Sequence, residues 1–152
     1  MKVDYPGIIL ESLTTNPEGK KKLSEDSIII FVCEHGAAKS ILAAAFFDRL
    51  AREKGLRFRA IARGTHPDSE ISSKTIVGLK QDGLSPTQLT PAKLTWEDMR
   101  SAQRIISFCE LPEEYLQRVP VEQWLDIPPV SESYKQARDA IIARLQTVLV
   151  NL

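Results

Sequence analysis

The sequence predicts an α/β protein: a single three-layer domain with a central four-stranded parallel sheet and helices on both faces. From residue 27 onward, strand-like runs of β-branched and apolar residues alternate with helix-like runs, a pattern that is typical of βαβ units. The length of 152 residues and the hydrophobic content of 43% suit one domain with one core. We therefore expect the domain over residues 25–152 and an N-terminal extension over residues 1–24, in which the Pro- and Gly-containing stretch 16–22 forms a loop.

The first half of the domain contains two predicted strands and two predicted helices. Residues 27–32 are mostly β-branched or aromatic, as expected for a strand that is buried on both faces. A helix rich in Ala and Leu is predicted over residues 40–54, with Gly55 as the residue that ends it. Alternation of polar and apolar residues predicts the second strand over residues 57–62, and a second helix is predicted over residues 72–82.

The second half of the domain begins with a short helix at Thr95, where Asp98 three residues later comes close to completing a capping box. Residues 104–108 are predicted as the third strand, and residues 123–127 as a short fourth strand that two prolines close. The last helix is predicted over residues 132–149. Its apolar residues recur every four positions on one face: Ala137, Ile141, Leu145 and Leu149.

Charge and composition argue against several functional classes. Lys plus Arg number 20, as do Asp plus Glu, and a zero net charge gives no electrostatic reason to expect nucleic acid or an acidic membrane surface. No apolar stretch is long enough to span a bilayer, and the N-terminus lacks the pattern of a secretory signal. Two cysteines do not make a disulfide scaffold. We expect a soluble cytoplasmic protein with reduced thiols and with neither nucleic acid nor a membrane among its partners.

The most informative segment of the chain lies between the first predicted strand and the first predicted helix. Residues 33–40 read Cys-Glu-His-Gly-Ala-Ala-Lys-Ser, so that Cys33 follows the strand directly. A thiol in this place lies among free backbone N–H groups and at the positive end of the helix dipole. Such groups favour a thiolate and attract an oxyanion. The segment therefore predicts a nucleophilic cysteine that attacks, or is regulated by, a tetrahedral anion.

The Cys-x5-Lys-Ser spacing in this strand–loop–helix setting resembles the Cys-x5-Arg-Ser/Thr loop of low-molecular-weight protein tyrosine phosphatases, whose fold thioredoxin-coupled arsenate reductases share. The resemblance covers about residues 27–150. Residues 62–67 are similar to the Ser-Ala-Gly-Thr segment after the second strand of that family, and residues 105–110 resemble its third strand. Trp124, followed by a Pro-containing loop and a long helix, resembles its C-terminal end.

This resemblance implies a phosphatase-like hydrolase that acts on a phosphomonoester, phosphotyrosine among the candidates, through a cysteinyl-phosphate intermediate. Cys33 would be the nucleophile, Ser40 would donate a hydrogen bond to its thiolate, and Lys39 would stabilise developing charge. The resemblance implies no cofactor and no metal, and the partner would be a phosphorylated small molecule or protein. Backbone N–H groups of six residues would surround the phosphate oxygens: Glu34, His35, Gly36, Ala37, Ala38 and Lys39.

Two positions depart from the family pattern. Lys39 stands where the family has Arg, and an ammonium group cannot hold two phosphate oxygens with a planar fork. Arg63 is a candidate for compensating this loss, or else a surface arginine. The Asp-Pro pair that supplies the general acid of the family is absent: Pro128 occupies the place of the acid, and Asp126 lies about two residues too early. Asp126 is the predicted acid, with Glu34 as the other carboxylate candidate.

Two further functions stay open at this point. Cys109 follows a predicted strand and resembles, by position, the second redox cysteine of the arsenate reductases, so an arsenate reductase that uses Cys33 and Cys109 with an external thiol donor is one alternative. Cys109 is equally interpreted as a buried structural thiol. Lys39 and the missing Asp-Pro pair favour the other alternative, a non-catalytic, oxyanion-binding pseudophosphatase. Tyr134 is the only aromatic residue just before the last helix, which weakens the prediction of phosphotyrosine specificity.

Two other classes of site fit the sequence less well. A nucleotide-binding loop ending in Lys-Ser would need glycines where Cys33 and Ala38 stand. A zinc site built from Cys33, His35, His66 and Cys109 would lack a usual ligand spacing.

Overall fold

Four strands form the sheet of the domain, and all three pairings between neighbouring strands are parallel. The central strand β5 (Ser27–Cys33) pairs with β6 (Phe58–Gly64) on one side and with β7 (Arg104–Ser107) on the other. The short edge strand β8 (Glu122–Gln123) pairs with β7. The predicted fold class is confirmed. The computed structural model describes the following residues of the chain: 3–5, 7–8, 13–16, 20–23 and 26–152.

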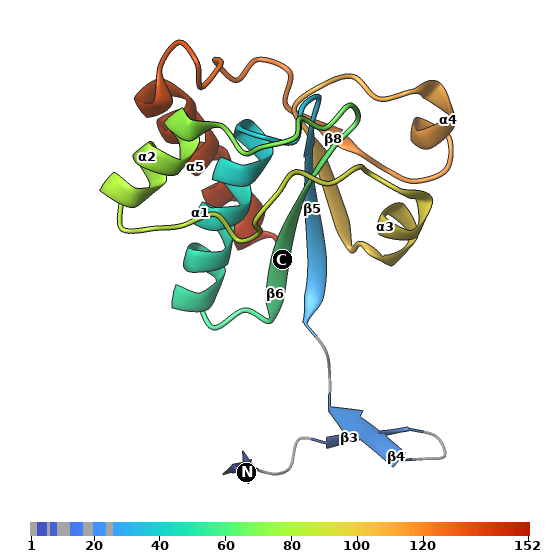
Figure 1. Ribbon diagram of the computed structural model, residues 1–152. Coiled ribbons are helices and arrows are strands. Elements are labelled where there is room, and N and C mark those ends of the chain that lie inside the picture. Colours follow the sequence, from blue (N-terminus) through green and yellow to red (C-terminus); the bar gives the residue numbers. More distant parts are fainter. Residues whose placement is uncertain (1–2, 6, 9–12, 17–19, 24–25) are drawn as a thin grey trace.

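Helices cover both faces of the sheet, and the three layers are visible in Figure 1. On one face lie α1 (Lys39–Glu53), α2 (Ser73–Gln81) and α5 (Tyr134–Val150), which contact one another. On the other face lie two short helices, α3 (Trp96–Ser101) and α4 (Glu113–Leu116). In the part of the chain that the structure describes, no helix has the length and apolar character needed to cross a membrane.

Strand β5 is buried because its side chains enter a hydrophobic core on each face of the sheet. Ile29 and Phe31 belong to the larger core, with residues of α1 and α5, whereas Ile30 and Val32 belong to the smaller core, with Met99 of α3. The four β5 side chains are all 0% exposed. The alternation of a strand therefore supplies apolar side chains to two layers, which explains the uninterrupted apolar sequence.

The predicted helices are confirmed, with ends that differ by at most two residues. α1 ends shortly before Gly55, whose φ of +70° is the left-handed conformation that glycine adopts without strain. At the start of α3 the capping box is complete, because Thr95 and Asp98 each accept the backbone N–H of the other with their side chains. The four predicted apolar positions of α5 are all buried.

The fourth predicted strand is wrong over most of its length, because only Gln123 of residues 123–127 belongs to β8. Trp124 and Ile127 are buried, whereas the two residues between them are exposed. Buried side chains three residues apart suit a turn, since a strand with one buried face buries every second residue. The chain thus leaves the sheet after two residues and runs over the surface toward α5.

Before the domain, the described residues form two antiparallel hairpins. β1 (Val3–Tyr5) pairs with β2 (Gly7–Ile8), and β3 (Leu13–Asn16) pairs with β4 (Lys20–Leu23). The loop predicted over residues 16–22 is therefore wrong at both ends, which belong to β3 and β4. The β-branched residues of β3 favour a strand, and the basic residues of β4 pair with it. Residues 17–19 and the predicted boundary between residues 24 and 25 lie outside the described residues, so the extension stays a prediction.

Candidate active site

The loop between β5 and α1 is held by hydrogen bonds to the segment that follows β6. Residues 34–38 connect Cys33, the last residue of β5, to Lys39, the first residue of α1. Four carbonyl groups at the end of β5 and in this loop accept hydrogen bonds from N–H groups of the segment that follows β6. The donor and acceptor pairs are Thr65 to Cys33 (3.2 Å), His66 to Glu34 (2.7 Å), Asp68 to His35 (3.0 Å) and Ser72 to Ala37 (3.0 Å).

These hydrogen bonds also determine the direction of the N–H groups in the loop. Within one peptide unit the C=O and N–H groups point in opposite directions. Because four carbonyls point toward the segment after β6, the N–H groups of Glu34, His35, Gly36 and Ala38 point away from it. None of these N–H groups donates to a protein acceptor among the residues that the structure describes. We call these N–H groups the amide nest, since successive free donors on one side of a loop suit an anion.

Cys33 lies at the floor of the amide nest, and Ser40 lies behind it. Cys33 is 8% exposed and Ser40 is 0% exposed, with 3.1 Å between Sγ and Oγ. The thiol donates to the hydroxyl oxygen, and after ionisation the sulfur can accept the hydroxyl hydrogen instead. The N-terminus of α1 places the positive end of a helix dipole beside the same sulfur. The Cys33 sulfur thus has a hydroxyl group within hydrogen-bond distance and a helix N-terminus beside it.

A depression of about 370 Å³ opens over Cys33 and collects side chains from four segments of the chain. Within the described residues, the Lys39 ammonium group has neither an ion pair nor a hydrogen bond with another protein group. It is therefore available to an anion in the depression. The lining residues are Cys33, Glu34, His35, Ala37, Ala38, Lys39, Asp68, Ser72, Phe108, Cys109, Pro129, Val130 and Ser131.

A family model described as "Low molecular weight phosphotyrosine protein phosphatase" matches residues 28–127. The matched range contains the amide nest, Cys33 and most of the sheet. The chain belongs to this phosphatase family. No curated protein matches the chain in sequence.

Solved structures of three proteins share the fold of this family member. YfkJ from Bacillus subtilis is 17% identical with a TM-score of 0.72, and the match covers 84% of this chain and 95% of that one. A YwlE mutant from Bacillus subtilis is 20% identical with a TM-score of 0.71, covering 83% and 98%. An arsenate reductase from Archaeoglobus fulgidus is 21% identical with a TM-score of 0.65, covering 80% and 98%. At these identities the likeness shows the fold alone.

The phosphatase-family fold brings most of the predicted site residues together. All six predicted phosphate-binding residues lie at the nest, and Cys109 lines the depression with Cys33 although the two are far apart in sequence. Carboxyl ends of parallel strands meet at one edge of a sheet, which explains this convergence. Within the described residues, no three His, Cys, Asp or Glu side chains are arranged to hold a metal ion.

Asp126 is not brought to the depression. Its carboxylate accepts a hydrogen bond from Arg144 of α5 over 2.7 Å, and its side chain is 72% exposed. The hydrogen bond from Arg144 lowers the pKa of Asp126 below its ordinary value. A carboxylate held ionised by an arginine is a poor proton donor, so no contact supports the predicted acid role. In the same loop Pro129 lines the depression, whereas Pro128, the residue expected in the place of the acid, does not.

Sequence reasoning missed Asp68 and the residues of the loop before α5 that complete the depression. Asp68 lies at the mouth, where its carboxylate contacts the His35 ring. A weaker signal existed in the sequence, because Asp68 lies six residues after the second predicted strand, in the loop that extends from its carboxyl end. Val130 and Ser131 carried no such signal, since their approach depends on the path of the loop.

Gly36 and Gly64 are in contact where the loop and the end of β6 meet. Gly36 has a φ of +61°, and a Cβ atom added to it would lie 2.9 Å from the Gly64 nitrogen. A Cβ atom added to Gly64 would lie 2.7 Å from the Gly36 nitrogen. Only glycine at both positions lets the two backbones approach closely enough for the hydrogen bonds behind the amide nest.

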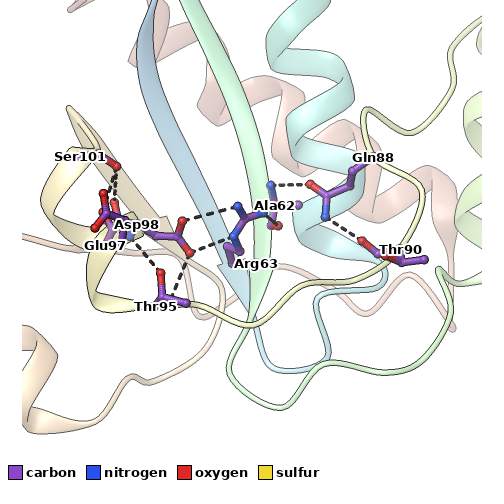
Figure 2. A network of polar contacts seen from close by, with 8 residues as sticks. All are labelled: Ala62, Arg63, Gln88, Thr90, Thr95, Glu97, Asp98 and Ser101. Carbon is purple, nitrogen blue, oxygen red and sulfur yellow. Dashed lines mark hydrogen bonds and ion pairs between the residues drawn. The ribbon is translucent and has the colours of Figure 1, made fainter.

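Arg63 does not compensate for Lys39, because it lies in a separate network at the end of β6 (Figure 2). Its Nε donates to the Asp98 carboxylate over 2.9 Å, and its Nη1 donates to the Ala62 carbonyl over 2.9 Å. Asp98 also accepts the Thr95 N–H at the start of α3 (Figure 2). The network therefore joins α3 to the strand residue that precedes Gly64.

We expect Asp98→Ala to lower the free energy of unfolding by roughly 2 kcal/mol, because it removes a helix cap and unpairs Arg63. The Asp98 side chain is 14% exposed. Glu97→Ala is the matched control: Glu97 pairs with Arg100 in the same helix, but their side chains are 83% and 68% exposed. Urea unfolding should show that Glu97→Ala lowers the free energy of unfolding by less than about 0.5 kcal/mol. Equal losses for the two variants would mean that the Arg63 contact contributes nothing.

Cys33 should be alkylated before Cys109 at mildly acidic pH. Burial raises the pKa of the Cys109 thiol, and nearby Cys33 and Glu34 add to this effect, so little Cys109 is ionised. Inorganic phosphate should protect Cys33, because the anion would occupy the amide nest over the sulfur. Peptide mass spectrometry after iodoacetamide treatment, with and without phosphate, measures both effects. Equal labelling of the two thiols that phosphate leaves unchanged would contradict this prediction.

Proposed function

We propose that the chain hydrolyses a phosphomonoester through a cysteinyl-phosphate intermediate on Cys33. One observation carries the proposal: the loop with the unpaired N–H groups of the amide nest begins at Cys33, which lines the depression, and Ser40 Oγ lies 3.1 Å from its sulfur. A bound phosphate group offers three oxygens to these donors while its phosphorus faces the thiolate. Membership of the phosphatase family supports the same chemistry.

The proposed reaction has two displacement steps at phosphorus. The Cys33 thiolate first forms the S–P bond while the bond to the leaving oxygen breaks, and water then attacks phosphorus and releases the thiolate. The amide nest and the Lys39 ammonium group stabilise the phosphoryl oxygens in both steps. The Ser40 hydroxyl stabilises the sulfur each time it carries negative charge.

The proposed substrate is a phosphorylated small molecule or a flexible phosphorylated side chain on a protein rather than phosphotyrosine. Among the described residues, Phe108 is the one Phe, Tyr or Trp that lines the depression, and it is 5% exposed and in T-shaped contact with Trp124. The hydroxyl of Tyr134 donates to Asp82 over 2.8 Å, outside the depression. Neither ring is available to stack on a tyrosyl group at the mouth.

Lys39→Arg should raise kcat on aryl phosphates by about tenfold, because a guanidinium fork adds a charge-assisted hydrogen bond in the transition state. Lys39→Met should lower kcat, since it removes the charge but keeps much of the side-chain length. Steady-state kinetics on para-nitrophenyl phosphate measures both variants. A fall in activity for Lys39→Arg with the melting temperature unchanged would show that the guanidinium group cannot replace the ammonium group in the transition state.

Arsenate reduction is a second candidate function, and the shared depression of the two cysteines favours it. The Cys33 thiolate would displace a hydroxide from arsenate and bond to arsenic. The Cys109 thiolate would then attack the Cys33 sulfur, so that a disulfide forms, the electron pair of the S–As bond stays on arsenic and arsenite leaves. An external thiol would reduce that disulfide. The raised pKa of Cys109 opposes this route, because the thiol must ionise before it attacks.

Acid quenching during turnover tests the proposal. Rapid mixing with radiolabelled para-nitrophenyl phosphate should give a burst of nitrophenol and a phosphoryl group bound to Cys33. Loss of two thiols on incubation with arsenate, without such a burst, would favour the reductase. Phosphate binding by calorimetry with neither burst nor thiol loss would instead identify a non-catalytic oxyanion-binding protein.

A further inference from the structure

The leaving group of the proposed substrate faces the mouth of the depression. Displacement at phosphorus is in line, so the leaving oxygen lies on the side of phosphorus opposite to the Cys33 sulfur. Cys33 is 8% exposed at the floor, whereas the side chains of Glu34, His35 and Asp68 are 62%, 59% and 54% exposed. All three residues line the depression. A proton for the leaving oxygen therefore comes from this group of side chains or from water.

His35 lies between the two carboxylates of this group. Its Nδ1 lies 3.1 Å from Oδ1 of Asp68, and its Nε2 lies 3.9 Å from Oε1 of Glu34. The Asp68 backbone N–H also donates to the His35 carbonyl over 3.0 Å, so the two residues are joined twice. When Nδ1 donates its hydrogen to Asp68, the ring orientation is held and Nε2 is the nitrogen that can exchange a proton with a ligand.

We infer that His35 is the general acid of the proposed phosphatase reaction and that Asp68 is its positioning residue; the inference rests on the proposed function. As the Cys33 sulfur bonds to phosphorus, the ester P–O bond breaks and its electron pair stays on the leaving oxygen. Nε2 of His35 transfers its proton to that oxygen. In the second step Nε2 takes a proton from the water that attacks phosphorus, the S–P bond breaks, and phosphate leaves with His35 protonated again.

The other acidic groups near the site fit this role less well. Asp126 is paired with Arg144 over 2.7 Å and does not line the depression. A carboxylic acid side chain ordinarily has no proton to give at neutral pH, whereas an imidazole ring can both give and take a proton there. Of the mouth residues, His35 is thus the one whose side chain can serve as acid in one step and base in the next.

The dependence of rate on the leaving group tests this role. His35→Asn should lower kcat on phenyl and benzyl phosphate by about 10²- to 10⁴-fold, and on para-nitrophenyl phosphate by less than about threefold, because nitrophenolate leaves without a proton. His66→Asn is the matched control, since its ring contacts Thr65 and does not line the depression. It should leave kcat unchanged for both classes of substrate, and so should Asp126→Asn.

Two further measurements separate proton transfer from a structural effect. Imidazole added to His35→Ala should restore part of the rate on phenyl phosphate, because free imidazole can replace the missing ring. Asp68→Asn should lower kcat without raising KM. In the His35→Asn background it should have no further effect, since Asp68 acts through His35.

The outcomes distinguish this role from the proposed function itself. If the wild-type chain releases no nitrophenol from para-nitrophenyl phosphate, the proposed function fails and the His35 role fails with it. If the wild-type chain turns over but His35→Asn slows both classes of substrate equally, or imidazole restores nothing, only the His35 role is overturned. A selective loss in Asp126→Asn would assign the acid to Asp126 and would also overturn it.

Discussion

Cys33→Ser should lower kcat by roughly 10⁴- to 10⁶-fold, the range expected when an enzyme loses its nucleophile. A serine hydroxyl would lie in the same place but would carry its proton at neutral pH, so it would attack phosphorus far more slowly than a thiolate. The carbonyl hydrogen bonds that hold the amide nest involve no cysteine side chain. Phosphate binding should therefore persist in the variant.

Three measurements on Cys33→Ser check this expectation: turnover of para-nitrophenyl phosphate, phosphate affinity by calorimetry and the melting temperature. Cys109→Ser is the matched control, because it also replaces a thiol that lines the depression. It should keep hydrolysis and lose only arsenate-dependent thiol oxidation. Unchanged turnover in Cys33→Ser would exclude a cysteinyl-phosphate intermediate on this residue.

Gly36→Ala should lower the free energy of unfolding by about 3 kcal/mol and kcat by on the order of 10²-fold. At a φ of +61°, an alanine incurs the strain of the left-handed region, and its Cβ would lie 2.9 Å from the Gly64 nitrogen. The nearest atoms, from Gly64 and Arg63, are all backbone, so the strain is relieved only if the loop moves away from β6. That movement would shift the amide nest relative to the Cys33 sulfur.

Gly55→Ala separates the two causes, because Gly55 has a φ of +70° but no atom within 4 Å of an added Cβ. Its cost should be about 1 kcal/mol, with kcat unchanged, since strain alone acts there. Urea unfolding and steady-state kinetics on both variants give the comparison. If Gly36→Ala costs no more than Gly55→Ala, the contact with Gly64 does not limit the loop.

Local patterns predicted the elements whose formation depends on their own residues. The apolar run of β5, Gly55 after α1 and the Thr95–Asp98 capping box each have a cause within a few residues, and each is confirmed. The fourth strand was predicted in about the right place but too long, because the extent of β8 depends on its pairing with a neighbour, β7, that only the folded sheet supplies. Trp124 and Ile127 are buried three residues apart, whereas a strand with one buried face buries every second residue.

The sequence by itself determined the fold class and the position of Cys33 at a strand end before a helix, because strand burial and helix dipoles follow from local sequence. It could not determine which acidic side chains line the depression over that thiol. Asp126, close to the expected place along the chain, is held by Arg144, whereas Asp68 reaches His35. The tertiary structure decides which carboxylate lies near the site, because this depends on the parallel packing of β5 and β6 and on the path of the loops beyond them.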